Sequence, residues 1–243
     1  MFGAFTCSLA PAGIWTRPGT ADSFMAIGTT ELCDRYAELY PGAVTDVLDD
    51  MGYSSRTLPS ALEPLTPDVR MAGIAYPVHG HPDEQCDYEE NIRKFLTMLG
   101  EAPSNSVIAY ETRDDEAAHI GELSTTALQV RGCRGAVVDG GVRDVRFIRE
   151  QGFPTFARYL TPADAPPRWS LAEWNVPIRI GDVEVRPGDV LVGDADGVVA
   201  VPGNVREDVL ERAEDLVETE DAVREAVLDG VSPLEAFEEH GAF

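Results

Sequence analysis

Basic residues are scarce in this chain, and their scarcity excludes several classes of function. The 243 residues include 19 lysines and arginines against 43 aspartates and glutamates, which gives a formal net charge of −24. A surface this negative repels both nucleic-acid phosphates and anionic lipid headgroups. We therefore expect a protein that binds neither nucleic acid nor membrane.

Lysine is nearly absent, since Lys94 is the only one in the chain. Schiff-base aldolases and pyridoxal-phosphate enzymes need a lysine amine that bonds covalently to the substrate or the cofactor. Lys94 lies in the segment NIRKFLTML, whose spacing of apolar residues is typical of an amphipathic helix. A mechanism through a covalent amine is therefore disfavoured.

Long apolar runs and paired cysteines are also missing. No segment approaches the roughly 18 to 20 apolar residues that a membrane-spanning helix needs, and the apolar N-terminal residues lack the basic start of a secretory signal. The four cysteines form no CxxC pair, which fits reduced thiols better than a disulfide framework or a zinc site. These features predict a cytoplasmic protein, with residues 1–28 as an N-terminal arm or extension.

The rest of the chain, residues 29–243, reads as one α/β domain. A strand at 135–140, a helix at 142–152 and a strand at 154–160 form a βαβ unit, which predicts a partly parallel sheet. Short strands separated by Gly-Asp and Pro-Gly turns follow from 175 to 202. Other helices are predicted over 29–39 (capped by Thr29 or Thr30), 45–52, 89–100, 119–132 and 206–230, with a short one after Ser232, and other strands over 69–80 and 106–112.

The turn DGGVRD (139–144) is the best candidate for a site, because it leaves a buried strand and opens a helix. Ligands often bind at strand ends in α/β sheets, and the free N–H groups of a helix start attract anions. The guanidinium of Arg143 can pair bidentately with a carboxylate, and the carboxylate of Asp144 is a hard ligand suited to Mg²⁺ or Mn²⁺. Together they could hold a 2-oxo acid. The alternative is an ordinary helix N-terminus with a surface ion pair.

Three further segments accompany this turn. Gly121-Glu122-Leu123-Ser124 precedes it, with twenty residues between Glu122 and Arg143, and the strands FPTFAR and PGDVLVGDADGVVAVP follow it. From about Ala43 to Gly241 the combination resembles the RraA-like family, which includes the regulator of ribonuclease E activity A and the class II 4-hydroxy-4-methyl-2-oxoglutarate aldolases. The resemblance implies an α/β sandwich of the swivelling phosphohistidine-domain type, with mixed sheet layers flanked by helices. It also implies a homotrimer or a hexamer.

The resemblance implies a role for each matching residue. Arg143 would bind the carboxylate of the pyruvyl group, and Asp144 would anchor Mg²⁺ or Mn²⁺. Glu122 would orient water on the metal and assist proton transfer, although aldolases of the family usually carry aspartate there.

Two further elements of the site are implied. The backbone N–H groups of Leu123 and Ser124, next to Gly121, would face the substrate. Glu220, from the C-terminal helix of a neighbouring subunit, would complete the site.

The same resemblance leaves two main functions open, and a third possibility is an enzyme on the same scaffold that acts on another 2-oxo or sugar-acid substrate. One is a metal-dependent lyase that cleaves a 4-hydroxy-2-oxo acid or decarboxylates oxaloacetate. The other is a non-catalytic regulator that inhibits a protein partner by docking.

The remaining signals are weaker. His79, His81, Asp83 and Glu84 suggest a metal site, but polar residues of an exposed loop are the preferred interpretation. His119 is either a group behind the site or simply exposed, and Asp194 and Asp196 fit a turn between strands.

Overall fold

The structure is a computed structural model, and it describes residues 27–241. The expected N-terminal arm therefore lies outside the described residues, except for Ile27 and Gly28. Seven helices and eleven strands follow each other in the described part of the chain. The helices are α1 (Thr29–Glu38), α2 (Pro41–Asp50), α3 (Tyr88–Glu101), α4 (Glu122–Val130), α5 (Val145–Gln151), α6 (Arg206–Leu228) and α7 (Pro233–His240). The strands are β1 (Glu63–Pro64), β2 (Met71–Pro82), β3 (Ser106–Glu111), β4 (Ala118–Ile120), β5 (Gly135–Val142), β6 (Thr155–Leu160), β7 (Trp169–Trp174), β8 (Ile178–Ile180), β9 (Val183–Val185), β10 (Val190–Asp194) and β11 (Gly197–Val201).

Nine of the strands form one strongly curved mixed sheet in the order β1-β6-β5-β3-β2-β10-β11, with β4 on β5 and β7 on β2. The pairs β2–β3, β3–β5 and β5–β6 are parallel, which confirms the predicted βαβ unit. The pairs with β1, β7, β10 and β11 are antiparallel. The short strands β8 to β11 confirm the expectation for residues 175–202.

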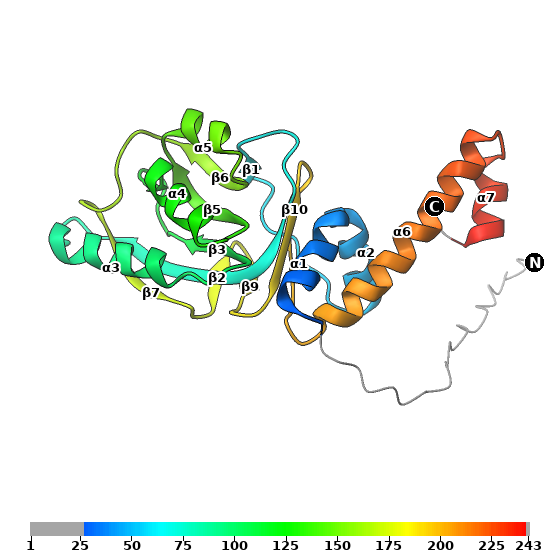
Figure 1. Cartoon of the computed structure of the whole chain (residues 1–243), viewed down its shortest axis with the longest axis horizontal. Coiled ribbons are helices and arrows are strands. Elements are labelled where there is room, and N and C mark those ends of the chain that lie inside the picture. The colour runs from blue at the N-terminus through cyan, green and yellow to red at the C-terminus, as the bar shows by residue number, and fades with distance from the viewer. Residues whose placement is uncertain (1–26, 242–243) are drawn as a thin grey trace, which may run out of the picture.

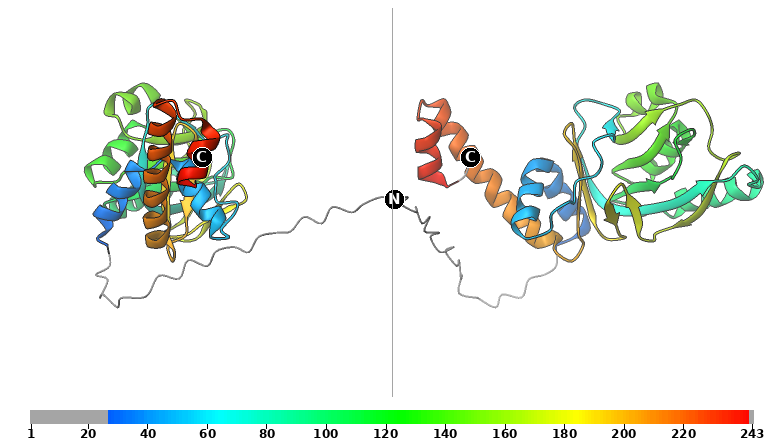
Figure 2. Two further views of the ribbon diagram at one scale, coloured as in Figure 1. Left: turned by 90° about the vertical axis from the view of Figure 1, so that its right-hand side faces the viewer. Right: turned by 180° about the vertical axis from the view of Figure 1, so that it is seen from behind.

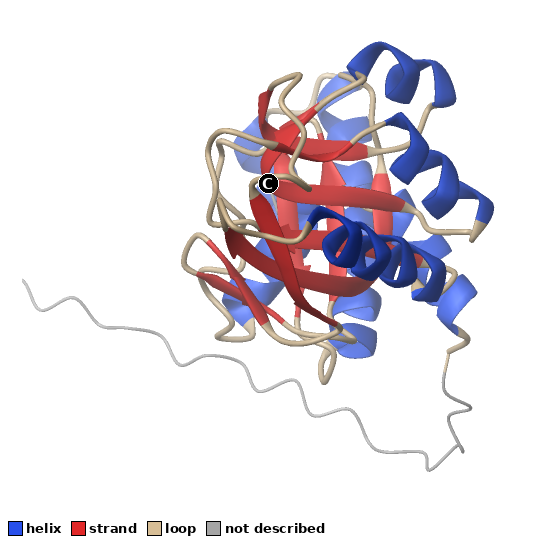
Figure 3. Ribbon diagram, turned by 90° about the vertical axis from the view of Figure 1, so that its left-hand side faces the viewer, coloured by secondary structure: helices blue, strands red, loops and turns tan. Residues whose placement is uncertain are grey.

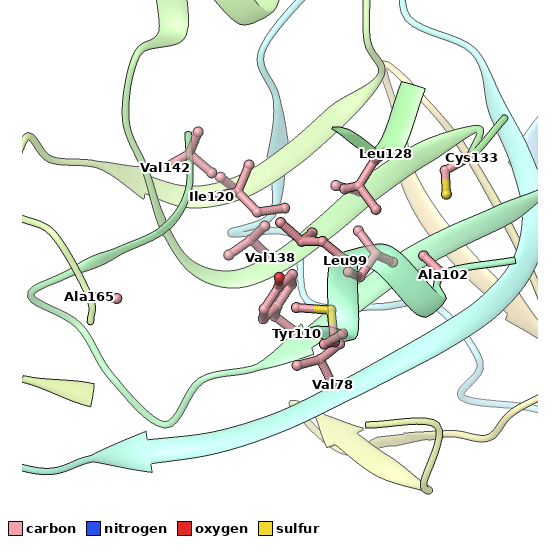
Figure 4. Close-up of a cluster of buried hydrophobic side chains, with 14 of the residues drawn as sticks. Val78, Leu99, Ala102, Tyr110, Ile120, Leu128, Cys133, Val138, Val142 and Ala165 are labelled. Atoms are coloured by element: carbon pink, nitrogen blue, oxygen red, sulfur yellow. The ribbon is translucent and has the colours of Figure 1, made fainter. Parts of the chain in front are cut away.

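Helices cover the sheet on two sides (Figures 1 and 3). The helices α3, α4 and α5 pack over the parallel strands on a core that includes Tyr110, Ile120, Leu128 and Val138. Figure 4 shows these side chains gathered with Leu99 and Val142. At the other end, α1, α2 and the first half of α6 pack on β10 and β11. The arrangement confirms a mixed α/β sandwich flanked by helices.

The second half of α6 extends away from the sheet, and α7 packs against its outer end (Figure 2). Ser232 caps α7 through a capping box with Glu235, as predicted. None of the described helices combines the length and the apolar character required to cross a membrane.

Several predicted element boundaries differ from those of the structure. The N-cap of α1 is Gly28 rather than Thr29 or Thr30. The helix α2 begins at Pro41 rather than near Thr45, because the fixed φ of proline suits the first helical position. Residues 119–120 belong to β4, and residue 142 to β5, because both segments pair with neighbouring strands. The strand β7 was not expected, and it pairs with the long strand β2.

Candidate active site

Arg143 and Asp144 lie in the turn between β5 and α5, outside the helix that the sequence predicted to start at residue 142. The Arg143 N–H donates to the carbonyl of Ile120 at 3.0 Å, which ties the turn to β4. Asp144 adopts the left-handed conformation, with φ of 57°, and is the N-cap of α5. Non-glycine residues in this region carry backbone strain and are frequent at functional sites.

Gly121 packs directly against this turn from the N-cap position of α4. A Cβ at Gly121 would lie 2.6 Å from Asp144 Oδ2 and 3.2 Å from Arg143 Nε. Only a residue without a side chain allows such a close approach. Gly121 therefore brings the start of α4 against the Arg143–Asp144 pair.

The first turn of α4 presents backbone N–H groups to the same place. The Glu122 N–H donates to Asp144 Oδ2 at 3.2 Å. Leu123 and Ser124 follow as the second and third helical residues, whose N–H groups have no partner within a helix. Because the N-cap is glycine, no side chain caps these groups, and they are available to an anionic ligand.

The Arg143 guanidinium lies between two carboxylates. Its Nε is 3.5 Å from Asp144 Oδ2, and its Nη1 is 3.0 Å from Asp164 Oδ1. The three side chains remain between 36% and 41% exposed. The guanidinium is therefore oriented by its neighbours and still open to a substrate carboxylate.

Asp164 was missed at the sequence level, where residues 161–169 read only as a turn-rich loop. The structure attaches this loop to β4, since the Ala118 N–H donates to the Ala163 carbonyl at 2.7 Å and the Ala165 N–H donates to the Ala118 carbonyl at 3.2 Å. Asp164 reaches the site through this pairing. No pattern within residues 161–169 indicates that Asp164 belongs to the site.

A cavity of about 670 Å³ joins these groups. One part of the cavity is lined by Gly121, Leu123, Ser124, Arg143, Asp144 and Asp164. These residues include every predicted substrate-binding residue and the predicted metal ligand. The helices α3 and α4 form its apolar walls. This volume is in the range of small-molecule binding sites.

The carboxylate of Glu122 is directed elsewhere. Its Oε1 accepts hydrogen bonds from Thr126 Oγ1 at 3.0 Å and from Gln151 Nε2 at 3.3 Å. Glu122 thus contributes its backbone N–H to the Arg143–Asp144 pair, whereas its side chain packs along α4 toward the end of α5. Its predicted role in proton transfer stays a prediction and requires another side-chain rotamer.

Glu220 lies on the outer part of α6, beside Val223, Arg224 and Val227. It does not line the cavity that Arg143 shares within the same chain. The prediction for Glu220 concerns a neighbouring subunit, and it stays a prediction.

His119 is buried, so the expectation of simple exposure is wrong. Only 2% of the residue is exposed, and its ring packs edge-on against Trp169 with centroids 4.8 Å apart. Its Nε2 is 3.2 Å from Asp114 Oδ2, but neither ring nitrogen makes a well-directed hydrogen bond within the described residues. Burial lowers the pKa of His119 to about 4, and Asp114 offsets this only in part. His119 is therefore neutral near pH 7, in the wall of the cavity.

Asp144, which is 41% exposed, would supply a metal ion with one carboxylate at this site. Within residues 27–241, no three His, Cys, Asp or Glu side chains gather into a group that could hold a metal ion. Structural zinc needs such a cage. Mg²⁺ instead uses one or two carboxylates together with waters and substrate oxygens, which matches a half-exposed carboxylate at the mouth of a cavity.

The other signals have structural explanations. His79 lies on β2 and not in a loop, with its Nδ1 3.4 Å from Glu111 Oε2. Asp83 accepts from Ser170 Oγ at 2.7 Å. Asp194 accepts from the Asp196 N–H at 2.8 Å between β10 and β11, which confirms the turn. These residues form no group of three His, Cys, Asp or Glu side chains that could hold a metal ion in the described part of the chain.

Comparison with known proteins shows to which family the chain belongs. The model of the RraA-like family, described as Aldolase/RraA, matches residues 29–200. The chain belongs to this family. A protein of Halalkalibacterium halodurans, provisionally named a 4-hydroxy-4-methyl-2-oxoglutarate aldolase, is 31% identical over 194 residues, which are 80% of this chain and 87% of that protein.

Solved structures agree with this membership of the RraA-like family. An uncharacterized protein from Pseudomonas syringae superposes with a TM-score of 0.78 at 26% identity, covering 91% of this chain and all of that one. RraAS2 of Streptomyces coelicolor, described as an unusual member of the RNase ES inhibitor RraA protein family, gives 0.72 at 24% identity, with 80% and 96% covered. The second likeness bears on the fold alone. The relatives therefore include both a protein named as an aldolase and one named for inhibition.

Proposed function

We propose that this protein is a divalent-metal-dependent lyase that releases pyruvate from 2-oxo acids. Its reactions would be retro-aldol cleavage of a 4-hydroxy-2-oxo acid and decarboxylation of oxaloacetate. One observation carries the proposal: the Arg143 guanidinium, the Asp144 carboxylate and the free N–H groups of α4 meet in one cavity. A guanidinium that pairs with a carboxylate, a hard metal ligand and anion-binding N–H groups together suit a 2-oxo acid.

The residues of the chain account for binding and charge. Arg143 pairs with the substrate carboxylate, and its fixed charge opposes the negative charge that grows on the pyruvyl group as the bond breaks. The N–H groups of Leu123 and Ser124 hold the same end of the substrate. Asp144 would hold Mg²⁺ or Mn²⁺, which when bound supplies a Lewis acid for the keto oxygen.

Both reactions break the bond between C3 and C4 of the substrate. In the retro-aldol reaction, a base removes the proton of the 4-hydroxyl, C4 leaves as a carbonyl compound, and the electron pair stays on the pyruvyl fragment as its enolate. The enolate then takes a proton at C3 to give pyruvate. Oxaloacetate loses carbon dioxide and needs no base at the hydroxyl. Glu122, in a rotamer turned toward Asp144, is the proposed base.

We further propose that the active assembly is a homotrimer or hexamer in which Glu220 of one subunit serves the site of the next. Within one chain, Glu220 lies on α6 and does not line the cavity that Arg143 lines. The outer half of α6 extends away from the sheet (Figure 1).

Pyruvate release tests the proposed function directly. The purified protein, treated with excess chelator and then dialysed, is expected to lose pyruvate release from oxaloacetate and from 4-hydroxy-2-oxo acids. Added Mg²⁺ or Mn²⁺ is expected to restore it, whereas Ca²⁺, with its looser coordination, restores much less. The measurement is pyruvate formation coupled to a dehydrogenase. Full turnover in chelator contradicts the metal mechanism, and no turnover with any metal favours the regulator.

A further inference from the structure

The cavity has one polar end and a long apolar remainder. The helix α3 contributes Tyr88, Ile92, Phe95, Leu96 and Leu99, which recur every three or four residues and so share one face. The helix α4 contributes Leu123, Ala127 and Val130 in the same way. The two faces line the same cavity, which starts at the Arg143–Asp144 pair.

The apolar part is longer than a pyruvyl group requires. The nine residues of α4 extend over about 14 Å at the helical rise. Gly121, at the start of α4, touches Arg143 and Asp144, and Val130 ends the helix. A three-carbon pyruvyl unit held by Arg143 covers only roughly 3 Å at ordinary bond lengths. Most of the cavity therefore faces the substrate beyond C3.

The charged residues that line the cavity also limit which groups the substrate can carry beyond C3. Apart from the polar end, the lining has one other permanent cation, Arg131. It follows the last residue of α4, and its Nε donates to the Ala102 carbonyl at 2.7 Å. A second carboxylate on the substrate would meet no cation among the apolar residues of α3 and α4 that line the cavity. These residues therefore offer a carboxylate no stabilising contact, whereas their apolar surface favours contact with an apolar group.

We infer that the preferred substrate is a 4-hydroxy-2-oxo acid whose C4 carries an apolar alkyl or aryl tail. This inference rests on the proposed function. The tail lies between α3 and α4, against Leu96 and Val130, which are 59% and 84% exposed. Cleavage between C3 and C4 then gives pyruvate and an apolar aldehyde, with the 4-hydroxyl proton removed and one proton added at C3.

Three substrates test the inference. Oxaloacetate reports the chemistry without a tail, 4-hydroxy-2-oxoglutarate carries a charged tail, and 4-hydroxy-2-oxo-4-phenylbutanoate carries an aryl tail. The kcat/KM for the aryl substrate is expected to exceed that for the diacid by about tenfold or more, as expected for an apolar group in a fitting pocket. A preference for the diacid overturns the inference but leaves the proposed function intact. Absence of pyruvate from all three overturns both.

A substitution of Leu96 tests where the apolar tail of the substrate binds. Leu96→Gln is expected to lower the ratio of kcat/KM for the aryl substrate to kcat/KM for oxaloacetate by about tenfold. The matched control is Leu234→Gln on α7, since Leu234 is also exposed (65%) and lines none of this cavity. It should leave the ratio unchanged. If a second copy of the chain covers α3 instead, Leu96→Gln lowers the mass of the assembly measured by light scattering. It then lowers kcat/KM equally for the aryl substrate and for oxaloacetate, and this result overturns the inference.

Discussion

Asp144→Asn is expected to reduce metal-stimulated pyruvate release by about 1000-fold or more in kcat/KM, because the amide cannot neutralise a divalent cation. The substitution preserves shape, and asparagine tolerates the left-handed backbone of this position at least as well as aspartate. The oxygen of the introduced amide can still accept from the Glu122 N–H. The loss is therefore expected without loss of the fold, as measured by thermal unfolding.

Asp46→Asn is the matched control, since Asp46 is exposed on α2, which packs on α6 and on β10 and β11 rather than on the cavity. It is expected to keep the activity of the unchanged protein. If Asp144→Asn retained more than about a tenth of the metal-stimulated rate, far above the loss expected for a metal ligand, Asp144 would not hold the metal.

Arg143→Lys is expected to lower kcat/KM by about 100-fold, mainly through a higher KM, because lysine keeps the positive charge but lacks the planar fork that pairs with a carboxylate. The substitution also loses the contacts to Asp144 and Asp164 that orient the guanidinium. The measurement is the Michaelis curve for oxaloacetate at saturating Mg²⁺.

Arg146→Lys on α5 is the matched control for this substitution. Its side chain is 80% exposed and forms an ion pair with Glu150, one turn further along the same helix, and its guanidinium lies 5.7 Å from the centre of the Phe147 ring. A change below about threefold is expected there, since an exposed ion pair contributes little. A similarly small change for Arg143→Lys would show that the charge alone binds the substrate and would remove the bidentate contact from the mechanism.

The pattern of the sequence predicted the part of the fold that carries the site. Alternating apolar runs and helical spacing identified the unit β5–α5–β6, because a buried parallel strand and its crossover helix leave strong local signals. The Arg143–Asp144 turn follows from that unit. The cap at Ser232, which the sequence also predicted, is equally local.

The rest of the site depends on contacts between distant segments. Asp164 reaches Arg143 only because its loop hydrogen-bonds to β4. The burial of His119 follows from its packing on Trp169, which lies much later in the chain. The apolar walls exist only where α3 and α4 line the same cavity. Local patterns contain no information on such neighbours.

The structure also separates two roles that the sequence had combined in Glu122. The resemblance to the RraA-like family implied a side chain that orients water on the metal and assists proton transfer. In the free chain the backbone N–H contacts Asp144, and the carboxylate bonds to Thr126 and Gln151. Glutamate is one methylene longer than aspartate, and this added reach allows the alternative bonds.

A crystal structure with Mn²⁺ and oxalate tests the central claim most directly, because oxalate is a planar dianion with the shape of the pyruvate enolate. We expect one anomalous peak beside the Asp144 carboxylate and oxalate chelating that ion, with its outer oxygens on the Arg143 guanidinium and the N–H groups of Leu123 and Ser124. Mn²⁺ bound away from Asp144, or oxalate bound without Arg143, would contradict the account.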